Sequence, residues 1–189
     1  MNLVFQAAEA LQSFLKEQQL RFCFIGGLAL QHWGEPRVTR DVDATVFVGF
    51  GNEEALAKSL FTRFSPRVAD FWEKALRARV ALLVDANGVG LDVAFGALPF
   101  EERMVQRSQE VRFLPDWSLR ICSAEDLIVT KALAGRARDW LDVETIIIRQ
   151  GSKLDWAHIL RELTPLAELA EKPELLGELE RLRRKVEKK

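Results

Sequence analysis

Two aspartates at the start of an apolar segment constrain this chain more than any other feature. Asp41 and Asp43 flank Val42 and lead into Ala-Thr-Val-Phe-Val, residues 44–48. In a strand, residues i and i+2 project from the same face, so we expect both carboxylates on one side. Two anions this close repel each other unless water or a cation lies between them. The strand therefore begins either in solvent or at a metal site.

A third aspartate, Asp92, lies in the apolar segment Gly-Leu-Asp-Val-Ala-Phe-Gly, residues 90–96. An aspartate inside an apolar strand is costly to bury unless it is paired or ligated. The segment follows Asn87-Gly88, a strong hairpin signal, and we expect its strand beside that of Asp41. Three carboxylates on neighbouring strands favour a two-metal site, because hard divalent cations take oxygen ligands and bind substrate phosphates.

Each of these acids also has a simpler interpretation. Asp41 and Asp43 suit a solvated strand start, and Asp92 suits an ion pair with a nearby arginine. Their occurrence together with a glycine pair favours the metal site. Gly26 and Gly27 stand between an apolar strand and a short helix, where backbone N–H groups and the helix dipole suit a phosphate.

Strand and helix patterns alternate up to residue 122, and the remainder is helical. We expect helices over residues 3–19, 28–34, 52–64 and 68–78, with Asn52 as a cap, and strands within residues 21–27, 42–49, 79–96, 109–115 and 119–123. From Ser123, whose capping box includes Asp126, we expect one helix to about residue 150. Two further helices, divided by Pro165 and Pro173, complete the chain. The predicted domains are an α/β core over residues 1–122 and a helical region over 123–189 that packs on it.

Composition narrows the class of protein. The net charge of −1 gives no whole-chain case for nucleic-acid binding, and two histidines make a histidine-rich metal site hard to build. No secretory signal or membrane-spanning apolar segment is visible, so we expect a cytoplasmic protein without a membrane partner. Cys23 and Cys122 stand in apolar segments and are expected in the core.

A second set of charged residues stands on the helix that follows Ser123. Within Lys-Ala-Leu-Ala-Gly-Arg-Ala-Arg-Asp-Trp-Leu-Asp, its members are Lys131, Arg138, Asp139 and Asp142, and Ala134 follows Lys131 by three residues. On a continuous helix, Lys131 and Asp139 are about two turns apart on one face, and Arg138 and Asp142 form an i,i+4 pair. A surface ion-pair network explains these residues without any chemistry.

The combined pattern resembles the DNA polymerase β-like nucleotidyltransferase superfamily. The residues that carry this resemblance are Gly26-Gly27, the series Arg37-x-Thr39-x-Asp41-x-Asp43, and Asp92. The helical residues are similar to the Lys-x-x-Ala and Arg-Asp-x-x-Asp motifs of AbiEii-like nucleotidyltransferases, many of which are toxins of type IV toxin–antitoxin systems.

The resemblance implies an α/β (α+β) fold, with a small mixed sheet, flanking helices and a helical C-terminal part. It implies that Asp41, Asp43 and Asp92 bind Mg²⁺ or Mn²⁺ and take part in catalysis. Nucleotide binding falls to Gly26, Gly27, Arg37, Thr39 and Lys131. Lys131 is also expected to neutralise phosphate charge, while Asp139 is either catalytic or orients Lys131 or Arg138. Arg37 and Thr39 also fit an interpretation as loop residues.

The implied reaction transfers a nucleoside monophosphate from a nucleoside triphosphate to an acceptor hydroxyl. The expected acceptor is an RNA end, tRNA included, or a protein, and a cognate antitoxin protein is the expected partner. Two alternatives stand beside this toxin-like function. One is an antitoxin-like minimal nucleotidyltransferase that modifies a partner protein, and the other is a nucleotide-binding module without catalysis.

Overall fold

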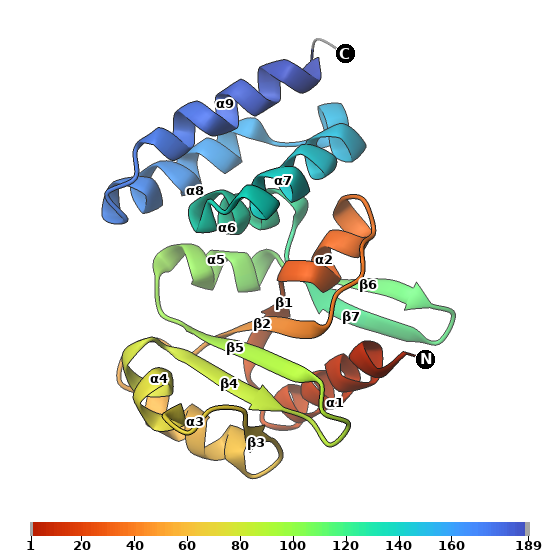
Figure 1. Ribbon diagram of the computed structural model, residues 1–189, viewed down its shortest axis with the longest axis vertical. Coiled ribbons are helices and arrows are strands. Elements are labelled where there is room, and N and C mark those ends of the chain that lie inside the picture. Colours follow the sequence, from red (N-terminus) through yellow and green to blue (C-terminus); the bar gives the residue numbers. More distant parts are fainter. Residues whose placement is uncertain (1, 188–189) are drawn as a thin grey trace. The chain divides into compact units, whose positions relative to one another are not determined.

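The computed structural model describes residues 2–187, and this part of the chain forms two compact units. The first comprises Met1–Leu28 and Val38–Cys122, and the second comprises Ala29–Arg37 and Ser123–Lys189. Figure 1 shows the elements of each unit. The second unit thus contains a segment, Ala29–Arg37, that the expected boundary at residue 122 leaves in the first part.

The first unit is built on one seven-stranded mixed sheet, in the order β3-β4-β5-β2-β1-β7-β6. Its strands are β1 (Arg21–Phe24), β2 (Asp41–Phe47), β3 (Ser65–Pro66), β4 (Val80–Val84), β5 (Gly90–Gly96), β6 (Gln109–Leu114) and β7 (Trp117–Ile121). The pairs β2–β5 and β1–β7 are parallel, and the other neighbours are antiparallel. This mixed sheet with flanking helices confirms the predicted fold class.

Helices of the first unit cover both faces of this sheet (Figure 1). They are α1 (Leu3–Glu17), α3 (Glu53–Phe61), α4 (Phe71–Arg77) and α5 (Pro99–Arg107). Helix α1 contacts β2 and β7, whereas α5 contacts β1 and β2 from the other side. A β-carbon at Gly96 would lie 3.2 Å from Glu101 of α5 and 3.1 Å from Thr45. Helix α5 therefore covers the face of β2 that carries Thr45, which is also the face of Asp41 and Asp43.

The hairpin predicted at Asn87-Gly88 is confirmed. Its turn joins β4 to β5, and Gly88 has a φ of 81°, a value that glycine adopts without strain. The side chain of Asp85 fixes the turn, because its Oδ1 accepts hydrogen bonds from the backbone N–H groups of Asn87 at 2.9 Å and Val89 at 2.8 Å. The hairpin places Asp92 at a defined position of β5.

Two expected helix features are wrong in detail. Asn52 occupies the N-cap position of α3 as predicted, but its side chain donates to the backbone oxygen of Val48 at 2.8 Å and makes no cap hydrogen bond. Pro165 does not end a helix, since α8 (Trp156–Leu169) continues through it. Buried side chains on both sides of the proline, Leu163 and Leu166, hold the helix in place despite the missing N–H.

The helix expected from Ser123 to about residue 150 is interrupted at Gly135. Ser123 caps α6 (Ala124–Ala134) as predicted, and its Oγ accepts a hydrogen bond from the backbone N–H of Asp126 at 3.1 Å. Gly135 then adopts a left-handed φ of 67° and ends α6, and α7 (Ala137–Gln150) follows. The second unit is completed by η1 (Gly151–Lys153), α8 and α9 (Glu174–Glu187).

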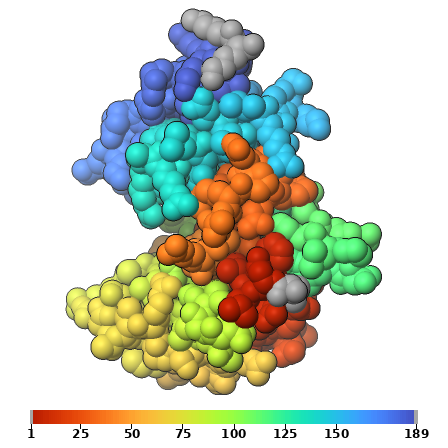
Figure 2. Space-filling model, turned by 45° about the vertical axis from the view of Figure 1, so that its right-hand side comes forward, coloured from red at the N-terminus to blue at the C-terminus, as the bar shows by residue number. Residues whose placement is uncertain are grey.

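Helix α2 (Gly26–Trp33) begins in the first unit and continues into the second. Hydrogen bonds from α7 explain why its end belongs to the second unit. Arg149 donates to the backbone oxygen of Gly34 at 2.5 Å, and Gln150 donates to that of Trp33 at 2.7 Å. The connection over residues 35–40, within the orange surface of Figure 2, is largely exposed.

Both cysteines are buried, as expected. Within residues 2–187, every helix is too short or too polar to span a bilayer.

Candidate active site

The three predicted aspartates lie on one face of the sheet in the first unit. Asp41 and Asp43 project from β2, and the parallel register places Asp43 directly beside Asp92 of β5. Asp41 is opposite Gly90 in the same register. All three aspartates are partly exposed, whereas the intervening Val42 is fully buried. The acid face, defined here as Asp41, Asp43 and Asp92, thus combines oxygen donors with access to solvent.

The glycine pair lies against this acid face. Gly26 has a φ of 58°, and a β-carbon there would lie 2.1 Å from Oδ2 of Asp43. A β-carbon at Gly27 would lie 2.4 Å from Oγ1 of Thr39. Real β-carbons do not approach heavy atoms this closely, so only glycine lets the start of α2 meet the acid strand. The backbone contact is completed by a 3.0 Å hydrogen bond from Ile25 N–H to the Asp43 carbonyl oxygen.

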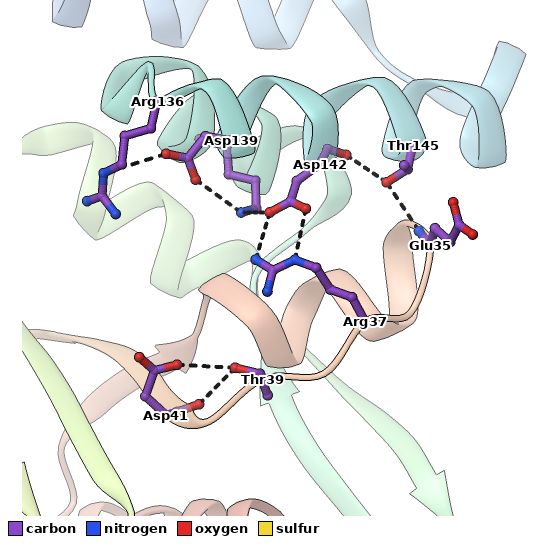
Figure 3. A network of polar contacts seen from close by, with 9 residues as sticks. Glu35, Arg37, Thr39, Asp41, Arg136, Asp139, Asp142 and Thr145 are labelled. Carbon is purple, nitrogen blue, oxygen red and sulfur yellow. Dashed lines mark hydrogen bonds and ion pairs between the residues drawn. The ribbon is translucent and has the colours of Figure 1, made fainter.

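Thr39 fixes the entrance to β2 (Figure 3). Its hydroxyl lies 3.2 Å from the Asp41 carbonyl oxygen and 3.2 Å from Oδ1 of the same residue. A hydroxyl that donates to a carboxylate restricts its rotamers. Thr39 therefore orients Asp41, and the structure brings together Gly26, Gly27, Thr39 and the acid face within the first unit.

The ion-pair partner of Asp92 is Arg67, a residue that the sequence analysis did not name. Nη2 of Arg67 donates to Oδ1 of Asp92 at 2.6 Å, and the two side chains are 37% and 32% exposed. Burial raises the pKa of Asp92, Arg67 lowers it, and the nearby Asp41 carboxylate raises it further, with a net upward shift. The simpler interpretation, in which Asp92 forms an ion pair with a nearby arginine, is therefore confirmed.

The remaining predicted residues lie in the second unit, around a buried lysine. Nζ of Lys131 lies 2.6 Å from Oδ2 of Asp142 and 3.4 Å from Oδ1 of Asp139. Lys131 is on α6, both acids are on α7, and the Lys131 side chain is only 7% exposed. The chain reversal at Gly135 creates these contacts, which a continuous helix does not.

Arg37 joins the same network through a fork of two hydrogen bonds (Figure 3). Its Nε and Nη2 donate to the two carboxylate oxygens of Asp142 at 3.0 and 2.9 Å. Among the described residues, the partners of Asp142 are thus Arg37 and Lys131, and not Arg138 as expected from an i,i+4 pair. Burial by itself would raise the pKa of Asp142, but hydrogen bonds from Arg37 and Lys131 outweigh it and lower the pKa below its ordinary value.

One carboxylate oxygen of Asp139 has no hydrogen bond to any described residue. Within residues 2–187, its Oδ2 is buried and has no hydrogen-bond donor. Nε of Arg136 lies 3.8 Å from this oxygen. A buried carboxylate oxygen is costly to leave unsatisfied, so Asp139 has capacity for a further donor beside Lys131.

The donor set of the acid face fits a divalent cation in chemistry. Within residues 2–187, no three carboxylate, histidine or cysteine side chains form a complete metal-binding group. Mg²⁺ does not need such a cage, because it commonly uses one or two carboxylates together with substrate phosphates and water. The neighbouring pair Asp43–Asp92, with Asp41 two residues away on β2, supplies oxygen ligands of this kind.

Two features of these sites were missed by reasoning from sequence. Arg67 follows the two-residue strand β3, which carries too little pattern to be recognised. Asp142 was named only as part of a motif, and its contact with Arg37 joins residues 105 positions apart. A cationic partner for Asp142 could have been predicted, because an acid on the buried face of an amphipathic helix requires a cation.

The seven-stranded mixed sheet with flanking helices is the fold that the resemblance to nucleotidyltransferases predicted. Comparison with known structures agrees on the fold. An antigenic nucleotidyltransferase-like protein from Paracoccidioides brasiliensis matches with a TM-score of 0.51 and 15% identity, over 94% of this chain and 92% of that chain. The antibiotic-resistance factor ANT(2'')-Ia is a weaker match, with a TM-score of 0.47 and 13% identity over 98% and 94% of the two chains.

A family model described as "Nucleotidyl transferase AbiEii toxin, Type IV TA system" matches residues 9–180. The chain therefore belongs to the AbiEii nucleotidyltransferase family, as its motifs predicted, and it is a nucleotidyltransferase. A comparison with curated proteins finds no significant match.

Proposed function

We propose that this nucleotidyltransferase transfers a nucleoside monophosphate from a nucleoside triphosphate to an acceptor hydroxyl, with a divalent cation, as the toxin-like member of a toxin–antitoxin system. The observation that carries the proposal is the approach of Gly26 to Asp43, where a β-carbon would lie 2.1 Å from the carboxylate. This approach places the backbone at the start of α2 against a partly exposed acid strand. A triphosphate that binds backbone N–H groups and a carboxylate-held cation needs both groups close together.

Asp41, Asp43 and Asp92 are the residues that would hold Mg²⁺ or Mn²⁺. When bound, such a cation supplies positive charge that stabilises the triphosphate and the leaving group. The backbone N–H groups at Gly26 and Gly27 bind phosphate oxygens, and Thr39 keeps Asp41 oriented. Positioning and charge neutralisation account for catalysis of this type.

The acceptor hydroxyl loses its proton to Asp92 as its oxygen attacks the α-phosphorus. The bond between the α-phosphorus and the bridging oxygen breaks, and pyrophosphate leaves with the electron pair of that bond. The roles expected of Lys131 and Arg37 in neutralising phosphate charge stay predictions, and within the second unit both side chains contact Asp142. Because Lys131 contacts Asp139 and Asp142, we assign Asp139 the role of orienting Lys131.

Family membership implies a nucleoside triphosphate substrate and a cognate antitoxin as partner. The proposed acceptor is an RNA 3′ end, tRNA included, or a protein hydroxyl, and the proposed location is the cytoplasm. The two alternatives differ from this function in what happens to the nucleotide. An antitoxin-like enzyme transfers it to a partner protein, and a binding module without catalysis does not transfer it.

A transfer assay separates these functions. Purified protein with Mg²⁺ receives each of the four α-labelled nucleoside triphosphates in turn, with total RNA or cell lysate as acceptor. We expect label in RNA, and a loss of about 10²-fold or more in Asp43→Asn and Asp92→Asn, because each removes charge that stabilises the transition state. Asp116→Asn, an exposed acid in the β6–β7 turn, is the matched control and should keep full transfer.

The other outcomes identify the alternatives. Label in a protein band supports the antitoxin-like enzyme, and nucleotide binding without transfer supports the binding module. Full transfer by both site variants, with circular dichroism unchanged, would overturn the assignment of the acid face.

A further inference from the structure

We propose that Arg67 is a further phosphate-binding residue, and that its pair with Asp92 competes with a divalent cation for the same carboxylate. This inference rests on the proposed function, because it assumes that Asp92 holds a cation and that the substrate is a nucleoside triphosphate.

The position of the guanidinium is the first observation. Its Nη2 lies 2.6 Å from Oδ1 of Asp92, and a β-carbon at Gly90 would lie 2.1 Å from its Nη1. Gly90 is opposite Asp41 in the β2–β5 register, and its added β-carbon would lie 3.7 Å from that of Asp41. The guanidinium therefore lies over Gly90, beside two of the three acids.

The chain holds the backbone of Arg67 while its side chain stays accessible. Its backbone N–H donates to the Leu82 carbonyl oxygen at 2.9 Å, and Leu82 is opposite Asp92 across β4 and β5. The side chain is 37% exposed. An anchored backbone with a long, partly solvated side chain allows the guanidinium to change partners without any change in the fold.

Electrostatics makes the two partners of Asp92 compete. A guanidinium and a divalent cation on one carboxylate repel each other, so each weakens the binding of the other. Once displaced, the guanidinium presents planar N–H donors that match phosphate oxygens in geometry. The same residue thus neutralises Asp92 before substrate binds and phosphate afterwards.

Two variants separate the two parts of this proposal. Arg67→Gln removes the charge, whereas Gly90→Ala keeps the arginine and fills the space under its guanidinium. Gly90 has no left-handed φ, so alanine is compatible with its strand backbone. Arg77→Gln, which removes an exposed partner of Glu73 at 2.9 Å, is the matched control.

The measurement is Mn²⁺ affinity without nucleotide, by electron paramagnetic resonance, followed by the affinity of a non-hydrolysable nucleoside triphosphate with Mn²⁺. We expect Arg67→Gln and Gly90→Ala to bind Mn²⁺ about 5- to 100-fold more tightly than the wild type, a typical range for coupling between two ligands. Nucleotide affinity should fall about tenfold in Arg67→Gln and be maintained in Gly90→Ala, which retains the guanidinium.

Unchanged or weaker Mn²⁺ binding in both variants would overturn the competition, and unchanged nucleotide affinity in Arg67→Gln would overturn the phosphate contact. These failures differ from a failure of the proposed function. In that case the wild type itself binds neither Mn²⁺ nor nucleotide.

Discussion

At the scale of single residues, the candidate site depends on Gly26, because the absence of a side chain there lets the start of α2 approach Asp43. Asp41, Asp43 and Asp92 were predictable because the two-residue period of strands and the Asn87-Gly88 turn determine the face on which each side chain lies. The approach of Gly26 to Asp43 was not predictable in its geometry, since many turns contain paired glycines. Contacts of this kind depend on how distant segments pack, which no local pattern reports.

Gly26→Ala tests this approach at the residue scale. Its left-handed φ of 58° costs alanine about 1–2 kcal/mol, and the β-carbon would also displace the Asp43 carboxylate. We expect a loss of stability of this size in urea unfolding, together with a loss of nucleotidyl transfer.

Gly51→Ala is the matched control for backbone strain. Gly51 has a φ of 85° and nothing within 4 Å of an added β-carbon. It should lose similar stability and keep transfer. Equal transfer in both variants would show that the contact between Gly26 and Asp43 has no functional role.

At the scale of elements, the break between α6 and α7 determines which charges meet. The sequence pattern on both sides of Gly135 is helical, so it favoured one helix and placed Lys131 and Asp139 two turns apart. The left-handed glycine instead reverses the chain and brings Lys131 onto both Asp139 and Asp142. Turn chemistry at one residue thus outweighed the periodicity of the flanking segments.

Two glycine substitutions in the second unit should change stability in opposite directions. Gly135→Ala places a side chain at a φ of 67° and 3.3 Å from Cδ2 of Leu175, so we expect a loss of about 1–2 kcal/mol. Gly177 lies in α9 with nothing within 4 Å of an added β-carbon, and alanine there should add about 0.5–1 kcal/mol. Urea unfolding measures both, and a stabilised Gly135→Ala would contradict the role of the break.

At the scale of the whole molecule, two acids with opposite pKa shifts belong to different units. The strand-rich part and the helical part were both recognisable from sequence, because their periodicities differ. The membership of Ala29–Arg37 in the second unit was not, since it depends on hydrogen bonds from Arg149 and Gln150 to a segment more than 100 residues away. That membership supplies Arg37 to Asp142.

The signs of the two shifts predict opposite effects of acid. The pKa of Asp142 is lowered, so the ionised form stabilises the fold, and this contribution is present above the ordinary value of 3.8 and lost as pH falls below it. The pKa of Asp92 is raised, chiefly by burial, so its ionised form costs stability at neutral pH. That cost disappears as pH falls through the raised pKa.

Asparagine variants of the two acids, unfolded in urea between pH 7 and pH 3, test this difference. Asp142→Asn should lose about 3–5 kcal/mol at pH 7, because two cations lose their buried partner, and its difference from the wild type should shrink below pH 3.8.

Asp92→Asn should be more stable than the wild type at pH 7. As pH falls, this gain should begin to shrink at a higher pH than the loss in Asp142→Asn does, because the raised pKa of Asp92 means that its carboxyl is protonated before that of Asp142. Since Asp92 is proposed to hold a cation, such a gain would mean that the protein maintains this charge at the expense of stability. A destabilised Asp92→Asn at pH 7 would instead indicate that the pair with Arg67 serves mainly to hold the fold.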